Sequence, residues 1–167
     1  MWLLPVVFMV HDFEEIIMMR PWIDRNSGFL RERFPRLAQR IVGQMDKLST
    51  SSFAFAVAEE FLIISIVTFL AVEYQWYAVW GGMLVGFFAH IIVHFVQFIA
   101  VRRYVPVIFT SVPAAIYCGY ALHYMLTGEY FSWATVWPWA LVFTVFIAVN
   151  IMLVHKLAAR FELWLRR

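Results

Sequence analysis

Carboxylates and histidines recur at helical spacing within strongly hydrophobic stretches of this chain. The carboxylates are Asp12, Glu14, Glu15, Glu59 and Glu60, and the histidines that accompany them are His11, His90 and His94. An ionised carboxylate in hydrocarbon is costly unless something compensates its charge. Because no Lys or Arg lies in the same stretches, protons, water or metal cations must supply that compensation. Imidazole and carboxylate together are suitable ligands for zinc, iron or manganese.

The spacing of these residues places them on shared helical faces. Positions i, i+3, i+4 and i+7 lie on one side of a helix. Two sets follow this rule, namely His11 with Glu14 and Glu15, and His90 with His94 and Gln97. Helical bundles that hold two metal ions use imidazole and carboxylate ligands at such spacings. The pattern therefore favours a metal centre built between helices.

The elements that must carry these residues are predicted to be membrane-spanning helices. The chain has 167 residues, of which 63% are hydrophobic and only 14% charged, whereas soluble domains average about a quarter charged residues. Apolar segments long enough to cross a bilayer are found at 2–19, 53–72, 78–101, 107–126 and 132–154. We expect one all-α domain over 1–167, an integral membrane bundle of about five transmembrane helices.

The long polar stretch of the chain, 20–52, is predicted to lie at the cytoplasmic surface. Within it, Leu37, Ile41 and Met45 recur at helical spacing opposite basic residues. This pattern predicts one amphipathic interfacial helix at about 34–45. The serines and threonine at 49–52 are candidates to cap the helix that follows.

The positions of the basic residues predict how the chain is oriented. All thirteen Lys and Arg lie in 20–52, at 102–103 or after residue 154, which the five-span arrangement places on one side. Short cytoplasmic loops are enriched in Lys and Arg. We therefore expect a multi-pass protein of the cell membrane with its N-terminus outside and its C-terminus in the cytoplasm. The N-terminal residues lack the features of a signal peptide, so we expect them to be retained.

The depth of the polar residues within the predicted spans is also consistent with one site. At about 1.5 Å per residue, His11 and His94 lie about 11–13 Å from the cytoplasmic ends of their helices. Glu59 and Glu60 lie at about 9–11 Å and Asn150 at about 7–9 Å by the same rise. The sequence therefore predicts one polar layer in the cytoplasmic half of the bundle.

The segment His11-Asp12-Phe13-Glu14-Glu15, followed by Pro21-Trp22, resembles the HXXEE-motif family of small polytopic membrane proteins. The Glu59-Glu60 pair and the His90-x-x-x-His94 spacing suit this resemblance. The family is functionally uncharacterised, so the resemblance implies a membrane protein with this motif and no particular reaction.

From the residues, the first functional hypothesis is a metal-dependent enzyme, with hydrolase and oxidoreductase both open. One or two divalent ions of zinc, iron or manganese would act on a lipidic or hydrophobic substrate from the cytoplasmic side. The predicted ligands are His11, Glu14, Glu15, Glu59, His90 and His94. Glu60 or Glu15 is the candidate general base, and supporting positions are assigned to Asp12, Gln97 and Asn150.

Two other functions remain open from the sequence. A buried relay of His and Glu could bind and transfer protons or metal ions, or the polar layer could specify assembly as a structural subunit. Membrane lipid is the expected partner, and nucleic acid is not, because topology and lipid headgroups account for the basic residues. The single cysteine, Cys118, excludes an intramolecular disulfide and a cysteine-based metal site.

Two packing features are also predicted. Gly82 and Gly86 are spaced to let two helices approach closely. A belt of tryptophans at the outer membrane interface is expected from Trp76, Trp80, Trp133, Trp137 and Trp139.

Overall fold

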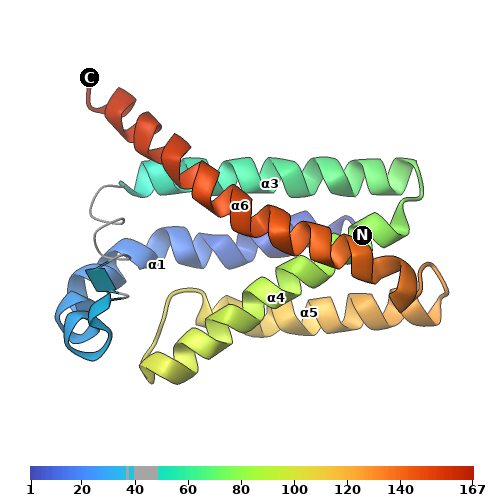
Figure 1. Ribbon diagram of the computed structural model, residues 1–167, viewed down its shortest axis with the longest axis horizontal. Coiled ribbons are helices and arrows are strands. Elements are labelled where there is room, and N and C mark those ends of the chain that lie inside the picture. Colours follow the sequence, from blue (N-terminus) through green and yellow to red (C-terminus); the bar gives the residue numbers. More distant parts are fainter. Residues whose placement is uncertain (37, 40–48) are drawn as a thin grey trace.

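A computed structural model describes residues 1–36, 38–39 and 49–167 of the chain. These residues form five helices and no strand, in the order α1 (Leu3–Arg33), α3 (Thr50–Glu73), α4 (Tyr77–Val101), α5 (Ile108–Thr127) and α6 (Trp133–Leu165). The predicted all-α bundle is confirmed. Figure 1 shows α1, α3 and α5 running along the long axis of the molecule, while α4 and α6 cross them obliquely.

Hydrophobic side chains between the helices form the core. The helix pairs in contact are α1 with α3 and α5, α3 with α4 and α6, and α4 with α5 and α6. The largest buried cluster includes Phe8 of α1, Val57 of α3, Leu84 of α4 and Cys118 of α5. Because these residues come from α1, α3, α4 and α5, their burial packs the inward faces of the four helices against one another.

Within the described residues, three helices are long and apolar enough to cross a membrane, namely α3, α4 and α6. Large apolar side chains stand exposed along their outer faces, for example Leu62, Ile99 and Val145. Lipid rather than water suits such a surface. The chain therefore has the features of a membrane protein, and crossing by α1 and α5, which would complete the five predicted spans, stays a prediction.

The first helix is longer than the sequence pattern predicts. The expected span ended at residue 19, but α1 continues through Pro21 to Arg33. Its later part buries Ile23 and Leu30 in a small cluster of their own, and this burial stabilises the extra turns. Proline removes a hydrogen bond and bends a helix, and in Figure 1 the lighter blue end of α1 turns away from the line of its first part. Most of the predicted amphipathic helix at 34–45, including Leu37, Ile41 and Met45, lies outside the described residues.

The last helix also extends beyond the predicted span, which ended at residue 154. Its 33 residues correspond to about 50 Å, more than the hydrocarbon core of about 30 Å. The helix is therefore longer than a single crossing requires, and a position of the part after residue 154 beyond the membrane stays a prediction. Glu162 in this part accepts hydrogen bonds from the Ser49 backbone N–H (3.0 Å), from the Ser49 and Ser52 hydroxyls and from Arg166. Ser49 is the N-cap of α3, so Glu162 ties the end of α6 to the start of α3.

Glycines allow α4 and α6 to pack closely, as predicted. A Cβ atom on Gly82 would lie 2.4 Å from Cβ of Trp139, and one on Gly86 would lie 3.1 Å from Cδ1 of Ile147. The first distance is far below van der Waals contact, so only glycine fits at position 82. This contact fixes how α4, which carries two of the histidines, lies against α6.

The predicted tryptophan belt needs one correction. Trp76, Trp133, Trp137 and Trp139 are between 41% and 60% exposed, whereas Trp80 is only 1% exposed. One turn into α4, Trp80 faces the core cluster instead of the surface. Tryptophan is common at a membrane interface, but Trp80 is on the inward face of α4 and is therefore buried in the core.

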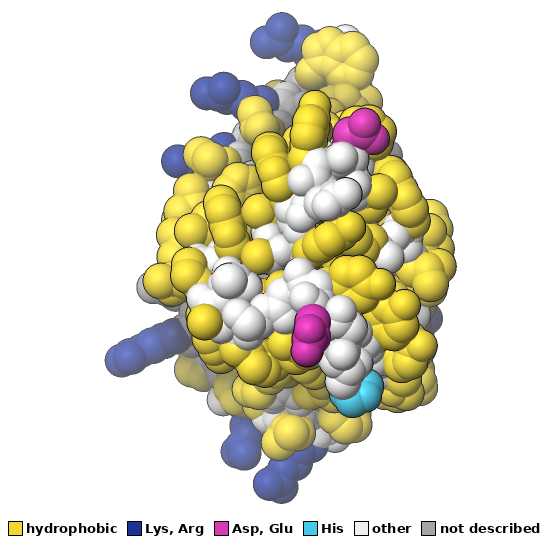
Figure 2. Space-filling view, turned by 90° about the vertical axis from the view of Figure 1, so that its right-hand side faces the viewer, with side chains coloured by type: hydrophobic (Ala, Val, Ile, Leu, Met, Phe, Trp, Pro, Cys, Tyr) yellow, Lys and Arg dark blue, Asp and Glu magenta, His cyan; other side chains and the backbone are white. Residues whose placement is uncertain are grey.

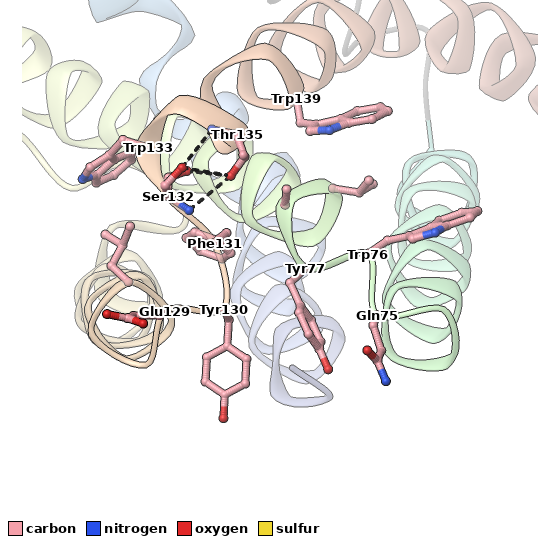
Figure 3. A pocket seen from close by; sticks show the side chains of 13 residues that line it. Gln75, Trp76, Tyr77, Glu129, Tyr130, Phe131, Ser132, Trp133, Thr135 and Trp139 are labelled. Atoms are coloured by element: carbon pink, nitrogen blue, oxygen red, sulfur yellow. Dashed lines mark hydrogen bonds between the residues drawn. The ribbon is translucent and has the colours of Figure 1, made fainter.

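The end of the molecule formed by the α3–α4 and α5–α6 turns carries little charge. Figure 2 shows this face with mostly hydrophobic side chains and some acidic ones, while Lys and Arg are seen only in the background. A hollow of about 830 Å³ lies here, with Trp76, Tyr77, Tyr130 and Trp133 among its lining residues (Figure 3). Aromatic side chains are typical of a membrane interface, so this hollow fits that setting, and it contains none of the predicted site residues.

Candidate metal centre

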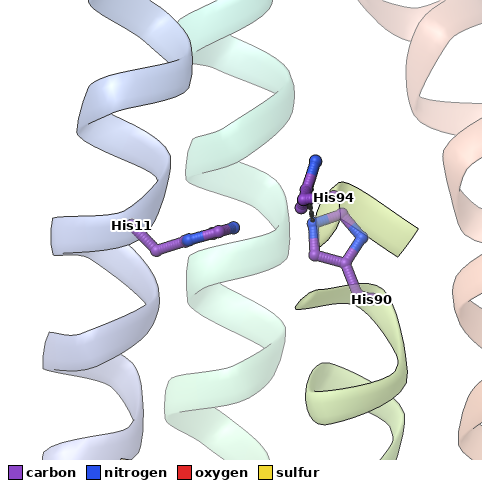
Figure 4. Close-up of side chains that lie close together, drawn as sticks. All are labelled: His11, His90 and His94. Atoms are coloured by element: carbon purple, nitrogen blue, oxygen red, sulfur yellow. Dashed lines mark hydrogen bonds between the residues drawn. The ribbon is translucent and has the colours of Figure 1, made fainter. Parts of the chain in front are cut away.

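Three histidines from two helices meet in the interior. His11 belongs to α1, and His90 and His94 lie one turn apart on α4. A ring nitrogen of each lies within 4.8 Å of a ring nitrogen of the others, and Figure 4 shows His11 reaching across toward the other two rings. His11 is fully buried and His94 is 6% exposed. Three converging imidazoles of this kind could hold a metal ion.

The orientation of His94 is set by its own helix. Its Nδ1 lies 3.0 Å from Oε1 of Gln97. An amide oxygen can only accept a hydrogen bond, so Nδ1 of His94 carries the ring proton. The other nitrogen, Nε2, is then unprotonated and faces Nε2 of His90 at 2.9 Å. This is the tautomer in which a histidine can bind a metal through Nε2.

The orientation of His11 is set by Thr110 of α5. The Thr110 hydroxyl has three acceptors within hydrogen-bond distance, and Oε2 of Glu14 at 2.7 Å is nearer than the carbonyls of Val107 (3.2 Å) and His11 (3.3 Å), so the hydroxyl proton is assigned to Glu14. The hydroxyl oxygen lies 3.4 Å from Nδ1 of His11 and is free to accept the proton of that nitrogen. Nε2 of His11 is then unprotonated, and it is buried with no hydrogen-bond partner among the described residues. A carboxylate, a hydroxyl and an imidazole thus form a chain that would orient His11 for binding a metal.

Glu14 anchors α1 to the start of α5. Besides the Thr110 hydroxyl, it accepts a hydrogen bond from the Thr110 backbone N–H at 2.8 Å and one from the Tyr104 hydroxyl at 2.8 Å. Free N–H groups in the first turn of a helix attract a carboxylate. Burial and the neighbouring Glu14 raise the pKa of Tyr104, which lies in the α4–α5 loop, so the phenol keeps its proton as a donor. Both oxygens of Glu14 therefore have partners other than the histidines.

The chain enters α5 through a strained residue. Val107, directly before the helix, has a φ of 69°, a conformation that is unusual for a β-branched side chain. Its side chain is fully buried, and its carbonyl accepts a hydrogen bond from Ser111 at 2.8 Å. This turn directs the first N–H groups of α5 toward Glu14, so the strain serves the geometry of the site.

Three other carboxylates form a separate group. The carboxyl groups of Asp12, Glu15 and Glu60 lie close enough to interact electrostatically. Asp12 is only 2% exposed, and its Oδ2 has no hydrogen-bond partner among the described residues. Glu59, the neighbour of Glu60, accepts a hydrogen bond from Asn150 of α6 at 3.0 Å. The acidic residues thus lie beside the histidines without joining their cluster.

Among the predicted ligands, the structure brings together His11, His90 and His94. Glu14, Glu15 and Glu59 lie outside this group, and their role as ligands stays a prediction. The predicted supporting residues have different partners, since Gln97 contacts His94 and Asn150 contacts Glu59.

A narrow cavity between the helices reaches His90. Its volume is about 70 Å³, and α1, α3, α4 and α6 all contribute to its wall. His90, Glu60 and Asn150 are the polar lining residues, and the others, such as Met83 and Phe143, are hydrophobic. The candidate general base and a candidate ligand therefore face one mainly apolar space.

Sequence reasoning did not find Thr110 and Tyr104. Threonine within a hydrophobic helix ordinarily bonds its own backbone, and tyrosine at a membrane interface is common, so neither carries a signal. Only their position could have indicated them, because both residues lie at the end of the bundle where the sequence predicts the polar layer.

The fold and the site define a class, a helical protein with membrane-spanning features and a buried cluster of three histidines that could hold a metal ion. Residues 2–122 match the model of a family described as "Protein of unknown function with HXXEE motif". The chain therefore belongs to the HXXEE family, as the resemblance predicted. Searches of curated proteins and of solved structures found no match.

The structure separates the three named residues of the HXXEE motif. His11 joins the histidine cluster, Glu14 binds Thr110 and Tyr104, and Glu15 lies with Asp12 and Glu60. The motif thus combines a candidate ligand, a residue that positions it, and part of an acidic group.

Proposed function

We propose that this protein is a membrane metalloenzyme in which His11, His90 and His94 hold one divalent transition metal ion. The observation that carries the proposal is the convergence of their ring nitrogens within 4.8 Å. The Nδ1 partners of His11 and His94 support it, because they leave the Nε2 atoms free to bind metal. Three histidine ligands leave a fourth position for water or substrate, as in catalytic zinc sites.

The spacing of the nitrogens is close to what an ion requires. Two nitrogens, each about 2.0–2.1 Å from a tetrahedral zinc, lie roughly 3.3 Å apart. The Nε2 atoms of His90 and His94 are 2.9 Å apart, so a shift of a few tenths of an ångström would suit these two ligands, and the ring nitrogen of His11 lies within 4.8 Å of theirs.

The surroundings of the cluster support a reaction on a hydrophobic substrate. A metal ion lowers the pKa of a bound water and so supplies a nucleophile at neutral pH. Glu60 lines the same cavity as His90 and would accept the proton of that water as general base. The other cavity walls are apolar, which suits a lipidic substrate that enters between helices. Zinc in the site would favour hydrolysis, while iron or manganese would favour an oxidoreductase.

The proposed orientation has the N-terminus outside and the C-terminus in the cytoplasm, in the cell membrane. Its support is the charge distribution, since Arg102, Arg103 and the basic residues at 20–36 and after 154 lie in or directly after the ends of α1, α4 and α6 that are opposite the α3–α4 and α5–α6 turns (Figure 1). Short basic segments favour the cytoplasmic side. The histidine cluster would then act on substrate from the cytoplasmic half of the membrane.

One observation favours a second candidate, a protein that binds and transfers protons. Asp12 is buried beside Glu15 and Glu60, and its Oδ2 lacks a partner among the described residues. Such a group could hold a proton. A relay also needs a polar path toward the opposite end, and there the buried core residues of α4 and α5 include Leu84, Leu122 and Met125. The metalloenzyme is therefore the preferred proposal.

Elemental analysis of the purified protein tests the proposal. Wild type is compared with His11→Ala and His94→Ala, all purified without chelators, and His123→Ala serves as the matched control. His123 is exposed on α5 and outside the cluster. We expect about one transition-metal ion per chain in wild type and His123→Ala, because their three ligands are intact.

The two cluster variants should lose the metal while keeping the helical circular dichroism of wild type. Wild-type protein without stoichiometric metal, or cluster variants that retain it, would overturn the proposal. The metal that is found also separates the hydrolase from the oxidoreductase.

A further inference from the structure

A second hollow lies at the basic end of the molecule, between the later part of α1 and the α4–α5 loop. Its volume is about 190 Å³, which is room for several water molecules. The polar lining residues are Arg25 and Asn26 of α1 with Arg103 and Tyr104 of the loop. It shares no residue with the cavity beside the histidines.

Two arginines converge on this hollow without an acidic partner. The guanidinium of Arg103 lies 4.1 Å from the centre of the Phe29 ring, a cation–π contact that orients it. Neither Arg25 nor Arg103 forms an ion pair in the described part of the chain, whereas Arg20 pairs with Asp24 and Arg166 with Glu162. Their positive charge is therefore available to a ligand.

The walls of the hollow are held in place by hydrogen bonds. The indole N–H of Trp22 donates to the Tyr104 carbonyl, which joins α1 to the loop, and the Asn26 amide donates to the Trp22 carbonyl at 2.8 Å. Arg102 ends α4 with a φ of 53°, and the chain turns there so that Arg103 reaches the hollow. Contacts within the fold therefore hold the shape of the hollow, in addition to the positive charge of its two arginines.

We propose that this hollow binds the phosphate of an anionic ligand through Arg25 and Arg103. Arginine binds phosphate oxygens with paired, charge-assisted hydrogen bonds. The remaining wall, formed by Met18, Pro21 and Trp22, is mainly apolar and suits the part of a lipid next to its headgroup. The phosphate could belong to an anionic phospholipid or to a soluble phosphate, and the test below separates these sources.

The phosphate site adjoins the candidate metal centre through one residue. Tyr104 lines the hollow, and its hydroxyl donates to Glu14, which in turn holds Thr110 next to His11. A ligand held at the arginines would therefore lie beside the chain of hydrogen bonds that positions His11. Binding of phosphate does not depend on the metal, so this proposal is tested separately from the proposed function.

The experiment uses the purified chain of 167 residues in a nonionic detergent. Dissociation constants are measured by native mass spectrometry and by the rise in thermal unfolding temperature. Three probes are used, namely dioctanoyl phosphatidylglycerol, dioctanoyl phosphatidylcholine and inorganic phosphate. The test variant is Arg25→Gln/Arg103→Gln, and the matched control is Arg31→Gln/Arg33→Gln, which removes the same charge from exposed positions at the end of α1.

We expect phosphatidylglycerol to bind wild type and the control variant, and the dissociation constant of the test variant to rise at least about tenfold, because charge-assisted hydrogen bonds are lost. Phosphatidylcholine, whose headgroup carries no net charge, should bind more weakly than phosphatidylglycerol. If inorganic phosphate gives the same arginine-dependent stabilisation, the source is a free phosphate, and if only the lipid does, it is a headgroup.

Three results would overturn the proposal. They are equal binding of phosphatidylglycerol and of inorganic phosphate to the test and control variants, equal binding of the two lipids to wild type without binding of inorganic phosphate, and no binding of any probe to wild type. Metal content and circular dichroism of the test variant show whether its fold is intact, and His11→Ala should bind phosphatidylglycerol like wild type even without metal.

Discussion

The Nε2 atoms of His90 and His94 lie 2.9 Å apart, and only one of these nitrogens can carry a proton. Because Gln97 keeps the proton of His94 on Nδ1, the proton between the two Nε2 atoms belongs to His90. A metal bound by both rings would require His90 to move its proton to Nδ1. A metal bound by both Nε2 atoms would replace the single hydrogen bond that joins the two rings.

The first prediction concerns the hydroxyl that links Glu14 to His11. Thr110→Val removes this hydroxyl, so His11 loses its Nδ1 partner. Loss of such an orienting group typically lowers metal affinity about 10- to 100-fold. Competition with a chelator of known affinity measures the change. Thr110→Ser keeps the hydroxyl and should bind metal like wild type, and a Thr110→Val variant with unchanged affinity would show that His11 needs no such support.

A second prediction addresses Glu59, which the sequence pattern assigned as a ligand. Glu59 accepts a hydrogen bond from Asn150 and does not belong to the histidine group. We expect Glu59→Gln to retain the metal of wild type, because the amide can still bond Asn150. Elemental analysis beside His94→Ala gives the comparison. Loss of metal in Glu59→Gln would instead make Glu59 a ligand.

The third prediction tests the close contact of α4 with α6. Gly82→Ala would place a methyl group 2.4 Å from Trp139 Cβ, and overpacking of this kind costs about 1–3 kcal/mol of stability. Gly119→Ala is the matched control, since a Cβ there meets no atom within 4 Å, and alanine favours a helix by about 1 kcal/mol over glycine. Thermal unfolding in detergent should rank Gly119→Ala at or above wild type and Gly82→Ala below it. Equal unfolding temperatures for the two variants would contradict the close packing.

The fourth prediction is a dependence of stability on pH through Glu162. Hydrogen bonds from Ser49, Ser52 and Arg166 lower the pKa of Glu162 from 4.5 to about 2. Because the pKa is lower in the folded protein, Glu162 contributes stability above pH 4.5, and that contribution is lost as the pH falls toward 2. Glu162→Gln should therefore be less stable than wild type at pH 7, with the difference shrinking below pH 4.5. A difference that stays constant between pH 7 and pH 3 would rule out this role.

The predictable part of the site followed from the regularity of helices. His90 and His94 share a face because four residues make about one turn, and estimated depth placed His11 at the same level. Glu14 shows where this reasoning stops. Its spacing from His11 would suit a ligand, but the structure shows Glu14 accepting hydrogen bonds from the Thr110 N–H at the start of α5 and from the Tyr104 hydroxyl. No pattern within α1 reveals these two donors.

Element ends were harder to predict than element positions. Hydropathy marks where a bilayer ends and not where a helix ends, so α1 and α6 both continue past the predicted boundaries. Ile23 and Leu30 bury the later part of α1 in a separate small core, and contacts of Glu162 hold the end of α6. These stabilising contacts are tertiary, and composition averaged over a segment does not report them.

By itself, the sequence determined that this chain forms apolar helices with uncompensated carboxylates and histidines inside them, because composition and helical period are local properties. Only the tertiary structure decided how those groups divide. The packing of α1, α4 and α5 directs three imidazoles toward one point and places Glu14 where Thr110 donates hydrogen bonds to it. Asp12, Glu15 and Glu60 form an acidic group beside them. The physical reason is that a side chain binds the nearest complementary group in space, and which group is nearest depends on how the helices pack.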